Sequence, residues 1–166
     1  MKGLSKTEIA AIANLEFKQK YYFTKEDIKD YFKNRRQMAN TIYGLRKKGR
    51  IVALNRNKYF LVPIKARYGK WTDHPIIIAD EMCDGKDYYI GGWYASHYWK
   101  LTDQVPMQID IFTTRRQGKK SLLNMRFIFH RTTRRSIGKA VMRRIGNHNF
   151  RILGREDAIR WMKSRK

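Results

Sequence analysis

Residues 34–49 of the chain read NRRQMANTIYGLRKKG, and this stretch decides which fold the sequence favours. It opens on Asn34, whose side chain is suited to cap a helix N-terminus, and closes on Gly49, which suits the position after a helix end. The sequence therefore predicts a helix over this stretch. Its apolar residues share one narrow stripe at helical spacing, namely Met38, Ile42 and Leu45.

The opposite side of this predicted helix is polar and basic. Four side chains fall within about 60° of one another there, namely Arg36, Asn40, Tyr43 and Lys47. Arginine can donate two hydrogen bonds to guanine and asparagine can pair with adenine, so this face suits the major groove of DNA. No acidic residue lies between Asp30 and Asp73 to repel phosphate. A solvated basic helix face is the plainer alternative.

Two further helices are predicted before this stretch. Ser5 followed three residues later by Glu8 is a capping box, which marks the start of the first helix. Thr24 starts the second helix, because acidic side chains follow it in the first turn, where the helix dipole favours them.

A β-hairpin is predicted after the stretch. Residues 51–54 and 58–62 are apolar strands on either side of a tight turn, Asn55-Arg56-Asn57. Three helices followed by a hairpin are typical of a winged helix-turn-helix, so we predict such a DNA-binding domain over residues 1–66.

The predicted DNA contacts fall into two groups. The base-facing residues are Arg36, Asn40 and Tyr43, with Gln37 beside them. The predicted phosphate and wing contacts are Arg35, Arg46, Lys47, Lys48, Arg50, Asn55, Arg56, Asn57 and Lys58.

The composition agrees with a nucleic-acid partner. The 166 residues include 37 Lys and Arg against 14 Asp and Glu, a formal net charge of +23. A polyanion relieves repulsion on this scale, so nucleic acid is the first expected partner and an anionic membrane surface the second. The sequence shows neither the roughly 18–20 apolar residues of a spanning helix nor a signal peptide. The absence of both segments and the single cysteine, Cys83, together predict a cytoplasmic protein without a membrane partner.

Groups that could carry catalysis do not converge in the sequence. Asp110 lies on a predicted strand, but no second acidic residue is near enough in the pattern to hold a metal. His97 and Cys83 lack a third group to orient them, and Ser96 has no nucleophile-elbow motif. We therefore predict no enzyme, no metal and no cofactor.

The remainder, residues 67–166, is predicted to be a small α+β domain, which makes the whole chain α+β. The predicted elements are a helix at 76–82, a strand at 88–90, a Gly91-Gly92 turn, a helix at 93–101, a strand at 107–113, a turn at 115–120, a strand at 122–130, a strand at 150–153 and a helix from 156.

Two features of this part have more than one interpretation. An aromatic cluster could stack single-stranded bases or form the core, and we expect Trp93 to be buried where the Gly91-Gly92 turn leaves room; its members are Tyr88, Tyr89, Trp93, Tyr94, Tyr98 and Trp99. A basic run could bind phosphate or be a solvated face; it comprises Arg131, Arg134, Arg135, Lys139, Arg143 and Arg144.

Residues 89–106 read YIGGWYASHYWKLTDQVP. The Gly-Trp pair and the later Leu-Thr-x-Gln-Val-Pro motif resemble the signature of the AbiEi antitoxin family, and Arg67-Tyr68-Gly69 is also similar to that family. The resemblance extends over residues 5–135. It implies an N-terminal winged helix followed by an antitoxin domain, here residues 67–166.

The same resemblance implies an autorepressing antitoxin of a type IV toxin–antitoxin system. Such a protein binds double-stranded DNA at repeats in its own promoter and opposes a nucleotidyltransferase-like toxin indirectly. An RNA- or ribosome-associated basic binding protein is the alternative, and a pure protein-interaction module is a third class.

Overall fold

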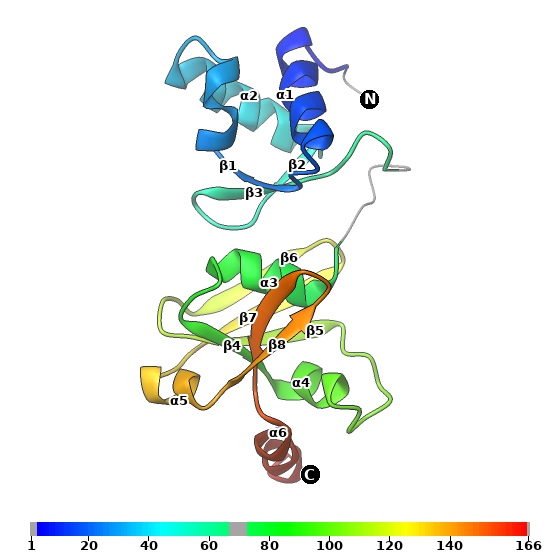
Figure 1. Ribbon diagram of the computed structural model, residues 1–166, viewed down its shortest axis with the longest axis vertical. Helices are drawn as coiled ribbons and strands as arrows, with labels where there is room; N and C mark the ends of the chain where they lie inside the picture. Colours follow the sequence, from blue (N-terminus) through cyan, green and yellow to red (C-terminus); the bar gives the residue numbers. More distant parts are fainter. Residues whose placement is uncertain (1–2, 67–72, 166) are drawn as a thin grey trace. The chain divides into compact units, whose positions relative to one another are not determined.

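The computed structural model describes residues 3–66 and 73–165 (Figure 1). The chain is α+β, as predicted, and divides into two compact units, Met1–Thr72 and Asp73–Lys166. The boundary that the sequence predicts at residue 67 and the family-like Arg67-Tyr68-Gly69 lie outside the described residues.

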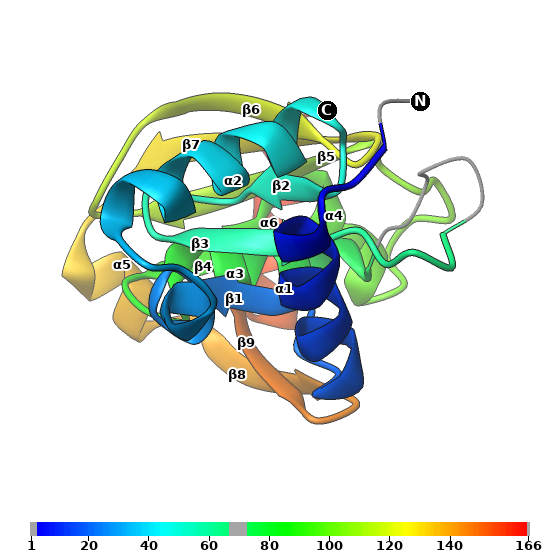
Figure 2. The ribbon, with the colours of Figure 1, turned by 90° about the horizontal axis from the view of Figure 1, so that it is seen from above.

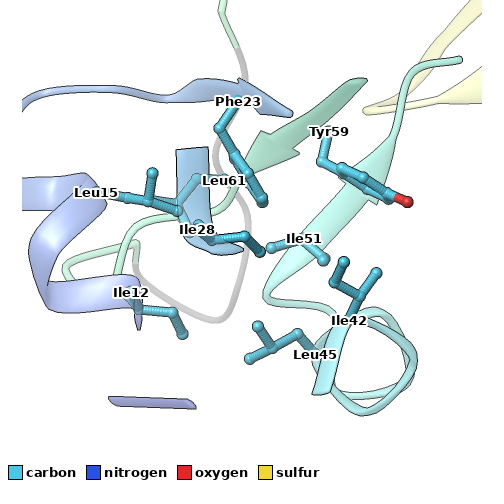
Figure 3. Close-up of a cluster of buried hydrophobic side chains, with 9 residues drawn as sticks. All are labelled: Ile12, Leu15, Phe23, Ile28, Ile42, Leu45, Ile51, Tyr59 and Leu61. Atoms are coloured by element: carbon cyan, nitrogen blue, oxygen red, sulfur yellow. The ribbon is translucent and has the colours of Figure 1, made fainter. Parts of the chain in front are cut away.

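The first unit packs three helical segments on one side of a small antiparallel sheet of order β1-β3-β2 (Figures 1 and 2). Its elements in chain order are α1 (Lys6–Phe17), β1 (Tyr22–Thr24), the 3-10 helix η1 (Glu26–Tyr31), α2 (Arg35–Lys47), β2 (Ile51–Ala53) and β3 (Lys58–Leu61). Its core contains buried side chains from every one of these elements (Figure 3): Ile12, Leu15, Phe23, Ile28, Ile42, Leu45, Ile51, Tyr59 and Leu61.

The predicted helix starts are confirmed in α1 and α2. The Ser5 hydroxyl accepts a hydrogen bond from the Glu8 amide, and the Glu8 carboxylate accepts one from the Ser5 amide, which completes the capping box. Asn34 caps α2 by accepting from the Gln37 amide at 2.9 Å. Gly49 follows the end of α2 at φ +69°, a conformation that glycine adopts without strain.

The region around the second predicted helix differs from the prediction. Its helical turns form the 3-10 helix η1, and the preceding residues form the unpredicted strand β1. Asp27 accepts hydrogen bonds from the amide and hydroxyl of Thr24, so Thr24 ends a strand and does not start an α-helix. A strand of three residues has too little alternation to be recognised, and its partner β3 lies far along the chain.

The second unit has a six-stranded mixed sheet of order β6-β7-β5-β4-β9-β8. Its elements in chain order are α3 (Pro75–Cys83), β4 (Tyr88–Gly91), α4 (Gly92–Tyr98), β5 (Gln108–Thr113), β6 (Gly118–Leu122), β7 (Met125–Arg131), α5 (Arg134–Gly138), β8 (Val141–Ile145), β9 (His148–Ile152) and α6 (Arg155–Lys163). The buried Tyr88 donates its hydroxyl to Asp80 of α3, so Tyr88 marks the sheet face that α3 covers.

Two edge strands and a short helix were not predicted in this unit. The segment predicted as a turn followed by one strand is the hairpin β6–β7, which turns at Leu123 and Asn124, both at positive φ. Helix α5 and strand β8 are also additional. In β6 and β8 apolar residues do not alternate with polar ones, because basic side chains such as Lys119, Arg143 and Arg144 interrupt the pattern, so the signal that reveals a strand is missing.

The predicted burial of Trp93 is wrong, because its residue is 42% exposed. It packs edge-on against Trp161 of α6, with ring centroids 5.3 Å apart. The space at Gly91 and Gly92 is occupied from β5. A Cβ on Gly91 would lie 2.6 Å from the Phe112 ring, and one on Gly92 would lie 2.6 Å from Asp110 Oδ2.

Most tyrosines of the aromatic cluster lie in the interior of this unit. Tyr88, Tyr89 and Tyr94 are at most 9% exposed. This burial favours the core interpretation of the cluster over a platform for single-stranded bases, which needs accessible ring faces.

The close approach at Gly92 makes a testable prediction. Gly92→Ala should lower the free energy of unfolding by about 1–3 kcal/mol, because the new methyl group collides with Asp110 and the backbone is at φ +62°. Urea denaturation followed by tryptophan fluorescence measures this change. The matched control is Gly138→Ala, which meets nothing within 4 Å and should be neutral or stabilising. Equal effects of the two substitutions would contradict the packing argument.

Candidate nucleic-acid interface

Helix α2 presents a polar face to solvent because its apolar stripe is used in the core. Ile42 and Leu45 are 5% and 2% exposed, whereas Tyr43 is 66% exposed. Arg36, Asn40 and Lys47 are also exposed. The structure therefore brings the four residues of the predicted face together on one accessible surface, which we call the α2 face.

Further predicted contacts surround the α2 face. Arg35 and Arg46 are exposed on the same helix, and Arg50 follows it at intermediate exposure. At the tip of the β2–β3 hairpin, Arg56 and Asn57 are exposed.

Two predicted contact residues have local structural roles. The Gln37 side-chain oxygen accepts from the Lys33 amide at 2.9 Å, which holds the chain at the start of α2. Asn55 Oδ1 accepts from the amides of Asn57 and Lys58, each at 2.9 Å, and so shapes the hairpin turn. Both oxygens orient the backbone that carries the neighbouring basic side chains.

Lys48 is held by an acidic residue of another helix. Its Nζ donates to both carboxylate oxygens of Glu8, at 2.8 and 2.6 Å. Glu8 is 5% exposed, so the pair is largely removed from water. Lys48 therefore joins α1 to the end of α2 and is withdrawn from the predicted phosphate contacts. No local pattern predicts this pair, because its members are 40 residues apart.

The environment of Glu8 favours its ionised form. Burial alone would raise the pKa of this carboxyl, but the hydrogen bond from Lys48 and those from Ser5 outweigh it and hold the pKa below its ordinary value of 4.5. A carboxyl with a lowered folded-state pKa stabilises the fold above its ordinary pKa, and that stabilisation is lost as the pH falls through the folded value.

The basic run of the second unit also faces solvent. Its six side chains, from Arg131 to Arg144, are all exposed. Arg143 lies over the Trp99 ring at 4.9 Å, and Arg144 donates to the carbonyl of Gly146 at 2.6 Å. This surface could meet phosphate or simply be solvated, as the sequence already suggested.

The structure pairs two groups that the sequence left apart. His130 Nε2 lies 2.7 Å from Asp110 Oδ1, because β5 and β7 are parallel neighbours. Within residues 3–66 and 73–165, no three His, Cys, Asp or Glu side chains gather as a metal site would require. Burial raises the pKa of the Cys83 thiol to about 12, which makes it a poor nucleophile.

In the described part of the chain, every helix is too short or too polar to cross a bilayer. Comparison of the sequence with protein-family models and with curated proteins found no match.

The Glu8–Lys48 pair predicts a pH-dependent stability. Glu8→Gln should destabilise the first unit by about 1–3 kcal/mol at pH 7, since a part-buried hydrogen bond between charged groups is lost. The difference from the unmodified protein should shrink as the pH falls below 4.5, where Glu8 itself becomes protonated. Urea unfolding at several pH values measures it.

Glu26→Gln is the matched control for this experiment. Glu26 pairs with Lys29 at 3.0 Å, but its side chain is 77% exposed, so solvent screens the pair and little change is expected. A Glu8→Gln penalty that stays constant down to pH 3 would exclude the ion pair as its cause.

Proposed function

We propose that this chain is a sequence-specific double-stranded DNA-binding transcriptional regulator whose first unit is a winged helix-turn-helix. The observation that carries the proposal is the α2 face, where Arg36, Asn40 and Tyr43 are exposed together opposite a buried apolar stripe. In such a domain one helix enters the major groove, and its first turns meet base edges. Arg36 and Asn40 lie in the first half of α2.

The β2–β3 hairpin takes the role of the wing in this proposal. Its exposed Arg56 reaches the DNA backbone or the adjacent minor groove, while Asn55 holds the turn that presents it. Arg46 and Lys47, at the end of α2, contact phosphates in this proposal. Such contacts supply affinity without reading sequence.

We further propose that the regulator is an AbiEi-type antitoxin, which represses its own promoter and opposes a nucleotidyltransferase-like toxin without forming a tight complex. Support comes from the Gly-Trp and Leu-Thr-x-Gln-Val-Pro motifs of residues 89–106 and from the order of a first unit with three helical segments on a small sheet followed by a second α+β unit. Co-expression with a nucleotidyltransferase-like protein encoded beside this gene tests it. We expect the unmodified chain to restore growth. Failure to restore growth would contradict the antitoxin part of the proposal.

A graded effect of two substitutions tests the DNA-binding part. Arg36→Ala should weaken binding to the specific site by about 1–3 kcal/mol and relax base preference, because a bidentate base contact is lost. Lys47→Ala should weaken binding to specific and random duplexes alike and reduce the slope of log affinity against log salt by about 0.9. Fluorescence anisotropy on the upstream DNA of the gene, over a salt series, measures both.

The control for these variants is Lys86→Ala, which removes an exposed charge from the second unit. It should leave base preference unchanged. Equal losses on specific and random DNA for Arg36→Ala would contradict base reading by α2. Stronger competition by structured RNA than by duplex DNA would favour the RNA-binding alternative.

A further inference from the structure

The second unit contains a pocket on the sheet face opposite α3. Its volume is about 420 Å³, within the range of roughly 300–1,000 Å³ that is typical of small-molecule sites. The strands β4, β5 and β7 form its floor, and the segments α5 and α6 contribute its rim. The α2 face lies in the other unit, so the DNA-binding proposal does not account for this pocket.

The floor is a ladder of three rings on adjacent strands. Tyr89 pairs with Phe112, and Phe112 pairs with His130, so the three side chains stand side by side. The Tyr89 and Phe112 rings are 5.0 Å apart and 6° from parallel, and the Phe112 and His130 rings are 4.8 Å apart and 22° from parallel. The third strand, β7, is paired with β6 only up to Phe129. No residue of β6 therefore lies opposite His130, and the His130 side chain is 40% exposed. A further flat ring can extend the stack at this end.

An acidic group on the middle strand of the ladder, Asp110 of β5, contacts the ring at its open end. Asp110 is 9% exposed between Ile109 and Ile111, both fully buried. It accepts from Gln108 Nε2 at 3.3 Å and lies 2.7 Å from His130 Nε2. Burying a carboxylate in a sheet is costly. Here the chain also places Gly92 at positive φ to make room for it, and such departures from local preference gather at functional sites.

The rim of the pocket is basic where the interior is acidic. Lys139, just after α5, and Arg165, just after α6, both line the pocket and are exposed. The acidic residue of the rim, Asp157, is paired with Arg160. Trp161 adds a second aromatic wall, over which the Arg165 guanidinium lies at 5.7 Å from the ring.

We propose that this pocket binds a nucleotide. The base stacks at the His130 end of the ladder and donates its amino or imino hydrogens to Asp110, and the phosphate meets Lys139 and Arg165. A nucleotide is complementary to the pocket, with hydrogen-bond donors on a flat ring for the acidic interior and negative charge for the basic rim. A free mononucleotide and a nucleotide of a single strand share this chemistry.

Calorimetry on the full chain tests the proposal, with AMP, GMP, CMP and UMP, their nucleosides and a short single-stranded oligonucleotide as probes. At least one nucleotide or the oligonucleotide should bind with a submillimolar Kd. Removal of the phosphate, or the double substitution Lys139→Gln with Arg165→Gln, should weaken binding about tenfold or more. Asp110→Asn should alter the order of base preference.

Two controls separate this site from the DNA interface. Lys163→Gln removes an exposed α6 charge that does not line the pocket, and it should leave nucleotide affinity unchanged. Arg36→Ala should also leave it unchanged, so failure of the DNA-binding proposal would not affect this result. Binding of mononucleotides identifies a free ligand, and binding of the oligonucleotide alone identifies a strand. No binding at millimolar concentration, or binding that the double substitution does not weaken, overturns the proposal.

Discussion

The packing of Ile42 and Leu45 into the core of the first unit determines what the rest of that unit can present to a partner. Burial of two such side chains contributes about 1.5–3 kcal/mol each, far more than any single exposed charge. Once these two are inside, the 3.6-residue repeat leaves Arg36, Asn40 and Tyr43 in solvent. The buried residues thus decide which positions of α2 face solvent. The side chains at those solvent-facing positions can vary without loss of the fold.

The second unit depends on a different constraint, the close approach of strand β5 to the start of α4. Phe112 and Asp110 occupy the space that side chains at Gly91 and Gly92 would need. This contact holds a carboxylate and a ring on the sheet face opposite α3, while Trp93 packs outside, against Trp161. Because Gly91 and Gly92 lack side chains, Phe112 and Asp110 of β5 can lie against them. These two residues line the pocket, and Asp110 makes its interior acidic.

Prediction from sequence succeeded where one element carried the whole signal. The cap at Asn34, the stripe of α2 and the β2–β3 hairpin are local patterns, and the structure has all three. Prediction failed where an element or side chain pairs with one far along the chain, and where a strand is too polar to show apolar alternation. Strand β1 needs β3, the Glu8–Lys48 pair joins two helices, and basic edge strand β8 shows no alternation. The Asp110–His130 contact depends on register between β5 and β7, which no spacing along the chain reveals.

The two units use charge in opposite ways, and the difference follows from desolvation. Cations that meet a phosphate backbone can stay hydrated until the partner arrives, so most basic residues on and around α2 are exposed, and the half-buried Lys48 has a carboxylate partner. Asp110 is instead desolvated in the folded protein, where a hydrogen bond is stronger because the local dielectric is low. A buried acceptor of this kind adds little to long-range attraction but discriminates between ligands at short range, since only a well-placed donor adds to the contacts that Gln108 and His130 already make with it.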